Sequence, residues 1–277
     1  MKRRAFVTKL ISSAFLIGVG NRVTAVGATF EPQAPARYRF AVASDGHYGQ
    51  PDTTFDEFHD EMINWLNADH QRKPLDFTMF NGDLIHDDPS LLSRVKAKFD
   101  QLNMPYYTSH GNHDRIEESV WKNTWTTDFN YSFTKDDLAF LILDTADIKG
   151  NYICPNVQWV KKELKKHRDA SGIFIFMHIS PAKWTENGLN CSRLTNLFSK
   201  TKNVKAIFHG HDHDLDALKV NKGKPHFFDS HIGGSWGTDY RGYRIVEILD
   251  DGNILTYQIN PASHVTVNEN NLARLQT

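Results

Sequence analysis

The sequence carries almost no net charge. Its 32 Lys and Arg residues nearly balance its 33 Asp and Glu residues, which leaves a formal charge of -1. No field of the whole protein therefore draws it to nucleic acid or to an anionic bilayer. Neither a basic run nor an added basic domain is visible, so nucleic acid is not expected as a partner. Any attraction for an anionic ligand must come from a local site.

The chain also lacks repeats, low-complexity tracts and an apolar run long enough to cross a bilayer. The apolar stretch at residues 10–20 is shorter than the roughly 20 residues that a spanning helix needs. A basic start precedes it, and the small residues 26–28 follow it, which is the arrangement of a cleaved secretory signal. We therefore expect no stable membrane anchor. No cysteine lies near the cleavage site to carry a lipid.

The segment from Arg3 to Lys9 resembles the twin-arginine export signal. This signal pairs two arginines, here Arg3 and Arg4, with a hydrophobic residue two places on, here Phe6, and often with a lysine. The resemblance implies the twin-arginine export machinery as a partner and a periplasmic or otherwise extracytoplasmic location. We divide the chain into a signal peptide at residues 1–28 and one domain at residues 29–277, since this length suits a single core.

Cysteine is scarce as well. Cys154 and Cys191 are the two cysteines, and both lie in segments expected to be loops. Outside the cytoplasm such a pair is able to form a disulfide. Two unrelated thiols are the alternative, because the sequence does not give the distance between them.

Apolar strands and helical patterns alternate along the rest of the chain. Strands are expected at residues 37–44, 75–80, 106–109, 172–177 and 204–208, and helices at residues 55–67, 91–102 and 157–167. This alternation predicts an α/β core. Further strands are expected at residues 139–144, 224–229 and 243–259, the last broken by a hairpin turn at residues 250–253. Part of the sheet should therefore be antiparallel.

Polar clusters follow five of these strands. They are Asp45-Gly46-His47, Gly82-Asp83, Gly111-Asn112-His113-Asp114, His178 and Gly210-His211-Asp212-His213. Each alone has a structural explanation, such as a turn aspartate or a hydrogen-bonded histidine. All five in this order are not expected by chance, and carboxylate, imidazole and amide groups together are typical of metal sites.

The five motifs resemble the signature of the calcineurin-like metallophosphoesterases, which runs DxH, GDxx, GNH followed by Asp or Glu, a lone His, and GHxH. The resemblance implies a four-layer α/β/β/α sandwich of two mixed β-sheets flanked by helices. It also implies two metal sites that share Asp83. The first would comprise Asp45, His47, Asp83 and His213, and the second Asp83, Asn112, His178 and His211.

The same resemblance implies catalytic roles for His113, which would face the leaving group, and for Asp114, which would orient His113. The activity implied is hydrolysis of a small phosphorylated substrate, a monoester or a diester, by attack of a hydroxide that bridges the metals. Two divalent ions, less two carboxylates and one hydroxide, leave about one positive charge, so the site attracts phosphate although the protein is near neutral. The oxygen and nitrogen ligands suit manganese, iron or zinc, as divalent or trivalent ions, without choosing among them.

Several points stay open in the sequence. In purple acid phosphatases a metal-binding tyrosine follows GDxx, whereas His86 stands there in this chain; His86 is a substrate contact, a partner of a ligand or a solvated residue. A non-catalytic binding module with the same fold is the alternative to an enzyme. The oligomeric state is open too. We expect His59, His70 and His167 at the surface, and His110 and His209 in support of ligands. Loops on the metal side are expected to carry, as substrate contacts or as packing, Trp184, Trp236, Tyr240, Arg115, Arg193 and Arg241.

Overall fold

The computed structural model describes residues 16–18, 23–25, 35–263 and 265–272. The chain forms two compact units, Met1–Pro35 and Ala36–Thr277. In the first, the short strands β1 (Leu16–Gly18) and β2 (Val23–Ala25) pair antiparallel. Most of the predicted signal peptide, including Arg3 and Arg4, lies outside the described residues. No helix in the described ranges is both long and apolar enough to cross a membrane.

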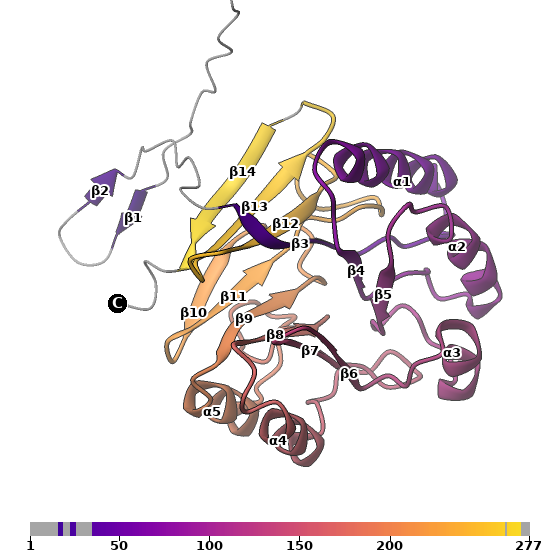
Figure 1. The fold of residues 1–277 in the computed structure, drawn as a ribbon. Coiled ribbons are helices and arrows are strands. Elements are labelled where there is room, and N and C mark those ends of the chain that lie inside the picture. The colour runs from indigo at the N-terminus through magenta and orange to yellow at the C-terminus, as the bar shows by residue number, and fades with distance from the viewer. Residues whose placement is uncertain (1–15, 19–22, 26–34, 264, 273–277) are drawn as a thin grey trace, which may run out of the picture. The chain divides into compact units, whose positions relative to one another are not determined.

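The second unit contains two six-stranded mixed sheets (Figure 1). The first sheet has the order β14-β13-β12-β3-β4-β5. Its strands are β3 (Ala36–Ala43), β4 (Phe77–Asn81), β5 (Tyr106–Ser109), β12 (Tyr243–Leu249), β13 (Ile254–Asn260) and β14 (Val265–Asn271). The first three pair in parallel, and β12, β13 and β14 extend the sheet in antiparallel pairs.

The second sheet has the order β10-β11-β9-β8-β7-β6. Its strands are β6 (Tyr131–Lys135), β7 (Leu138–Leu143), β8 (Gly172–Met177), β9 (Val204–His209), β10 (Leu218–Asn221) and β11 (Lys224–Phe228). The four central strands are parallel, and each edge strand is antiparallel to its neighbour. The parallel strands therefore end at one edge of each sheet, and the motif residues follow them there.

Helices cover the outer face of each sheet. The helices α1 (Phe55–Arg72), α2 (Leu92–Phe99) and α3 (Glu118–Trp125), with the short 3-10 helix η1 (Pro89–Leu91), lie over the first sheet. The helices α4 (Val157–Lys166) and α5 (Ser192–Lys200) lie over the second. The predicted four-layer α/β/β/α sandwich is confirmed.

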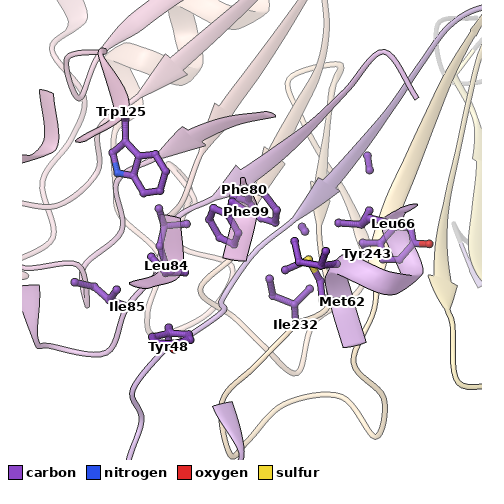
Figure 2. Packing of buried hydrophobic residues seen from close by; sticks show 14 of the residues in the cluster. Tyr48, Met62, Leu66, Phe80, Leu84, Ile85, Phe99, Trp125, Ile232 and Tyr243 are labelled. Carbon is purple, nitrogen blue, oxygen red and sulfur yellow. The ribbon is translucent and has the colours of Figure 1, made fainter. Parts of the chain in front are cut away.

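Three apolar layers hold these elements together. Between the two sheets, the ring of Phe40 stacks on that of Phe77 at 4.8 Å and meets Phe140 edge-on at 5.7 Å. Figure 2 shows the layer under α1 and α2, in which Met62, Leu66 and Phe99 face the first sheet. Both faces of each sheet are covered, which explains why the strands read as unbroken apolar runs rather than as alternating ones.

One buried ion pair joins the sheets. Arg244 of β12 donates from Nε to Asp229 Oδ1 at 2.5 Å, just after β11, and neither side chain is exposed. The same guanidinium donates to the carbonyl oxygen of Phe228 at 3.1 Å. Two charges removed from water in this way stabilise a fold only while both remain paired.

Candidate metal centre

Three side chains form the first of two buried clusters. Asp45 and His47 follow β3, and His213 follows β9. His213 Nε2 lies 3.0 Å from Asp45 Oδ1 and 3.0 Å from His47 Nε2. The three ligand atoms lie within 4.8 Å of one another, close enough to bind one ion.

The second cluster joins Asp83, His178 and His211, which follow β4, β8 and β9. Asp83 Oδ2 lies 3.1 Å from His178 Nε2. The same carboxylate oxygen is 3.7 Å from His47 Nε2 of the first cluster. Asp83 therefore lies between the clusters, as a shared ligand must.

The backbone is strained at four of these positions. Asp45, His47, Asp83 and His211 have φ angles of 59°, 44°, 50° and 68°, in the left-handed region that residues other than glycine seldom adopt. Neighbouring glycines make room for the turns: a Cβ on Gly82 would lie 2.4 Å from His178 Nδ1. Non-glycine residues held in this region cluster at functional sites, because such strain persists only where the surroundings impose it.

Hydrogen bonds fix two of the imidazoles. His178 Nδ1 donates to the carbonyl oxygen of Asn81 at 2.8 Å, and His213 Nδ1 donates to that of Trp236 at 3.1 Å. Because Nδ1 donates to the backbone, Nε2 of each ring faces the clusters, where a metal ion would replace the proton that the carboxylates otherwise hold there. This is the tautomer and orientation that a metal ligand requires.

Two polar atoms at the centre are buried without a hydrogen-bond partner among the described residues. They are Asn112 Oδ1 and His211 Nε2. A buried polar atom without a partner is destabilising. Both belong to the set implied for the second metal, so the residues present fit an ion in this place.

The carboxylates make the centre attractive to cations. Burial disfavours a charged His178, but Asp83 and Asp45 outweigh it and raise its pKa to about 10. Burial lowers the pKa of His47 to about 3 and that of His211 to about 4, so both stay neutral, as metal binding requires.

His113 lies at the rim of the centre, with 24% of its side chain exposed. Its Nδ1 is 3.0 Å from Asp87 Oδ1. The same carboxylate oxygen lies 3.0 Å from Arg115 Nε. The prediction that Asp114 orients His113 is wrong. Asp114 is fully buried and accepts the backbone N–H groups of Leu84, Ile85 and Gly111, so it shapes the turn instead.

His86 is a neighbour of the first cluster. Its Nδ1 lies 3.0 Å from His47 Nδ1, and its ring stacks on His113 at 4.8 Å. His86 therefore stands behind His47, on the ring edge that faces away from Asp45 and His213. A role as partner of a ligand fits this position better than a freely solvated one.

Other predicted residues divide between the centre and the core. The Trp236 ring stacks on that of His213 at 4.4 Å, whereas Trp184 packs on His226 away from the clusters. Arg241 pairs with Glu61 and covers Phe58. The prediction of surface positions is wrong for His59 and His167, which are buried.

A disulfide joins Cys154 and Cys191, which settles the alternative left open by the sequence. It ties the loop after β7 to the start of α5. That loop carries Tyr152, whose ring meets His211 edge-on at 4.9 Å. The sequence reasoning missed Tyr152, although its position two residues before Cys154 was a usable signal.

Comparisons with known proteins agree with this geometry. The family model described as "Calcineurin-like phosphoesterase" matches residues 38–215. A probable cyclic nucleotide phosphodiesterase of Fibrobacter succinogenes is 26% identical over 192 residues, 64% of this chain and 73% of that protein. A probable glycerophosphodiester phosphodiesterase of Arcobacter nitrofigilis is 24% identical over 184 residues, 60% of this chain and 67% of that protein. The crystal structure of a dimetal phosphatase from Danio rerio superposes with a TM-score of 0.68 at 13% identity, covering 86% of this chain and 99% of that one. Because the family model spans more than half of its length, the chain belongs to the calcineurin-like phosphoesterase family.

Proposed function

We propose that the protein is a hydrolase of phosphate esters that depends on two metal ions. The observation that carries this proposal is the pair of buried clusters that meet at Asp83. In the proposed ligand sets, Asp45, His47, Asp83 and His213 hold one ion. The other ion is held by Asp83, Asn112, His178 and His211. Manganese, iron and zinc all suit these ligands.

When bound, the two ions would supply the nucleophile and withdraw charge from the phosphoryl oxygens. The protein's own contribution is to hold the ligands in place and to handle the proton of the leaving group. In this proposal His113 donates that proton to the departing alkoxide. Its ring lies 4.9 Å from that of His47, and Asp87 binds its Nδ1, which supports the assignment. A small phosphorylated molecule is the proposed substrate, and the names of the two relatives favour a phosphodiester.

Two variants test this function. Asp83→Asn should remove both metals together, because both ligand sets share this carboxylate. His113→Ala should keep the metal content and should lose about 10²-fold or more on an alkyl ester, but much less on a p-nitrophenyl ester, whose leaving group departs without a proton. Full activity in protein with far less than two equivalents of metal would contradict the proposal. Absence of activity in protein with two equivalents of metal restored would favour the alternative of a binding module.

Export is a second, separate proposal. The resemblance of residues 3–9 to a twin-arginine signal supports passage of the folded protein through that machinery, with the mature chain beginning near Thr29. The disulfide between Cys154 and Cys191 supports an oxidising compartment outside the cytoplasm.

A further inference from the structure

Exposed apolar side chains gather around the metal centre. Among the described residues, the large apolar side chains that are exposed are Val120, Ile148, Tyr152, Ile153, Val220, Trp236 and Val265. Four of these seven lie on two loops, residues 147–153 and 234–241, and each loop places an aromatic ring against a candidate ligand. Apolar surface concentrated beside a polar site marks a place where a ligand binds.

Each cluster has one of the two aromatic rings beside it. Trp236 is 44% exposed and stacks on His213 of the first cluster, 4.4 Å away and nearly parallel. Tyr152 is 43% exposed and meets His211 of the second cluster at 4.9 Å. One face of the Trp236 ring therefore covers a candidate metal ligand, the Tyr152 ring packs against another, and both rings stay partly open to solvent.

The loop that carries Tyr152 is held firmly. The disulfide at Cys154 anchors one end, and Asp147 Oδ1 accepts the backbone N–H groups of Lys149 and Asn151. Gly150 approaches the turn beside His113 so closely that a Cβ there would lie 2.5 Å from the carbonyl oxygen of Asn112. An ordered aromatic ring binds a substrate group at a lower entropic cost than a mobile one.

The loop that carries Trp236 is held as well, and it borders a cavity. Gln50 donates to Ser235 Oγ at 2.9 Å, and the backbone carbonyl of Trp236 binds His213. The adjoining groove has a volume of about 560 Å³ and is lined by Trp236, Phe58 and Tyr240 among others. The groove meets the first cluster at Trp236, whose ring stacks on His213, and it has room for an organic substituent there.

The cation nearest to His113 along the chain is already neutralised. Arg115 pairs with Asp87 at 3.0 Å. A phosphomonoester carries one more negative charge than a diester and gains more from a free guanidinium. The surroundings of the centre thus supply two aromatic surfaces and no free guanidinium from this turn, which favours a substrate with two organic groups.

We propose that Trp236 and Tyr152 are specificity-determining residues that each contact one organic arm of a phosphodiester. The proposal rests on the proposed phosphoesterase function. The ring that contacts the leaving group should contribute to kcat/KM for every substrate with that leaving group. The other ring acts only on substrates whose retained arm is large enough to reach it.

Three substrates with one leaving group test the proposal: bis(p-nitrophenyl) phosphate, methyl p-nitrophenyl phosphate and p-nitrophenyl phosphate. Trp236→Ala and Tyr152→Ala are each expected to lower kcat/KM on the bis ester about three- to tenfold, the range typical of one aromatic contact. On the methyl ester, the variant that lacks the ring beside the leaving group should lose as much kcat/KM as on the bis ester. The other variant should keep nearly the wild-type kcat/KM, because a methyl group is too small to reach the missing ring. Tyr152→Phe should keep the wild-type values, because the ring is retained.

The controls distinguish a failure of the proposed roles of Trp236 and Tyr152 from a failure of the proposed phosphoesterase function. Trp236→Ala keeps the backbone carbonyl that binds His213, so the metal content should be unchanged. Val120→Ala, at a similarly exposed apolar residue of α3, should leave all three substrates unaffected. A wild-type protein inactive on all three with two equivalents of metal refutes the proposed function. If the wild type is active and neither variant changes the ratio of bis to methyl ester, only the roles of Trp236 and Tyr152 are refuted.

Discussion

The buried histidine His226 should make folding stability depend on pH in the mildly acidic range. His226 lies in β11 with 1% of its surface exposed, and its Nδ1 is 2.8 Å from His209 Nε2. Burial lowers its pKa from 6.5 to about 3. The native protein therefore keeps this ring neutral, whereas the unfolded chain takes up a proton below pH 6.5. The stability is fully present above that pH and is lost as the pH falls towards 3.

The size of the effect follows from the pKa difference. Each pH unit between the two pKa values is equivalent to about 1.36 kcal/mol. Between pH 7.5 and pH 5, His226 should therefore lower the free energy of unfolding by about 2 kcal/mol. Other buried histidines, such as His59 with its pKa lowered to about 4, add to the total slope of the wild type.

The measurement compares pH slopes rather than absolute stabilities. Urea unfolding of the wild type, His226→Gln and His226→Phe is followed at several pH values from 7.5 to 5, with a chelator present so that metal binding does not contribute. In both variants the free energy of unfolding should decrease by about 2 kcal/mol less than in the wild type between pH 7.5 and pH 5, whatever their stability at pH 7.5. Histidines that do not contact residue 226 cancel in the difference. His209 loses its partner in the variants, but burial, the main cause of its lowered pKa, is kept. Parallel curves for variants and wild type would refute the reasoning, since they would mean that the ring titrates alike in both states.

Three further perturbations have definite expected outcomes. Asp87→Asn should lower kcat on alkyl esters about tenfold or more with metal content unchanged, because the histidine that it orients loses a charged partner; loss of metal would show that the residue supports the ligands instead. Asp229→Ala should lower the free energy of unfolding by about 3–5 kcal/mol in urea titrations, because it leaves Arg244 buried and unpaired; a change below 1 kcal/mol would contradict this. Arg3→Lys combined with Arg4→Lys should retain the protein in the cytoplasm on cell fractionation, and unchanged export would exclude the twin-arginine route.

Much of the fold could be predicted from the sequence because its central strands are short, apolar and followed at once by polar motifs. The helix at Phe55 continues to Arg72, five residues beyond the predicted end, since a charged last turn hides its helical pattern. The edge strand β14 was missed because its sequence, VTVNENN, is mostly polar and pairs with only one neighbour. Helix α3 was missed too, being eight residues long with no clear cap.

The candidate site was predictable where residue type and strand order decide it, and not where side-chain direction does. Asp114 follows His113 directly, yet its carboxylate turns inward to backbone N–H groups, while Asp87, from another segment, reaches the histidine. In a tight turn, the side chains of consecutive residues can point in different directions, so sequence order does not predict which side chains meet. The predicted surface position of His59 was wrong for a related reason. Its neighbours in the sequence are charged, but it lies on the buried face of α1.

The left-handed backbone at Asp45, His47, Asp83 and His211 has a consequence for protein engineering. Such conformations cost on the order of 1–3 kcal/mol each in residues with a side chain. Glycine at these positions would relieve the strain, so a search for thermostable variants that ignored activity would tend to replace the very residues of the metal centre. If a substitution at one of these positions raises Tm and abolishes metal binding, that residue is kept for metal binding at a cost in stability. The measurement needs no substrate.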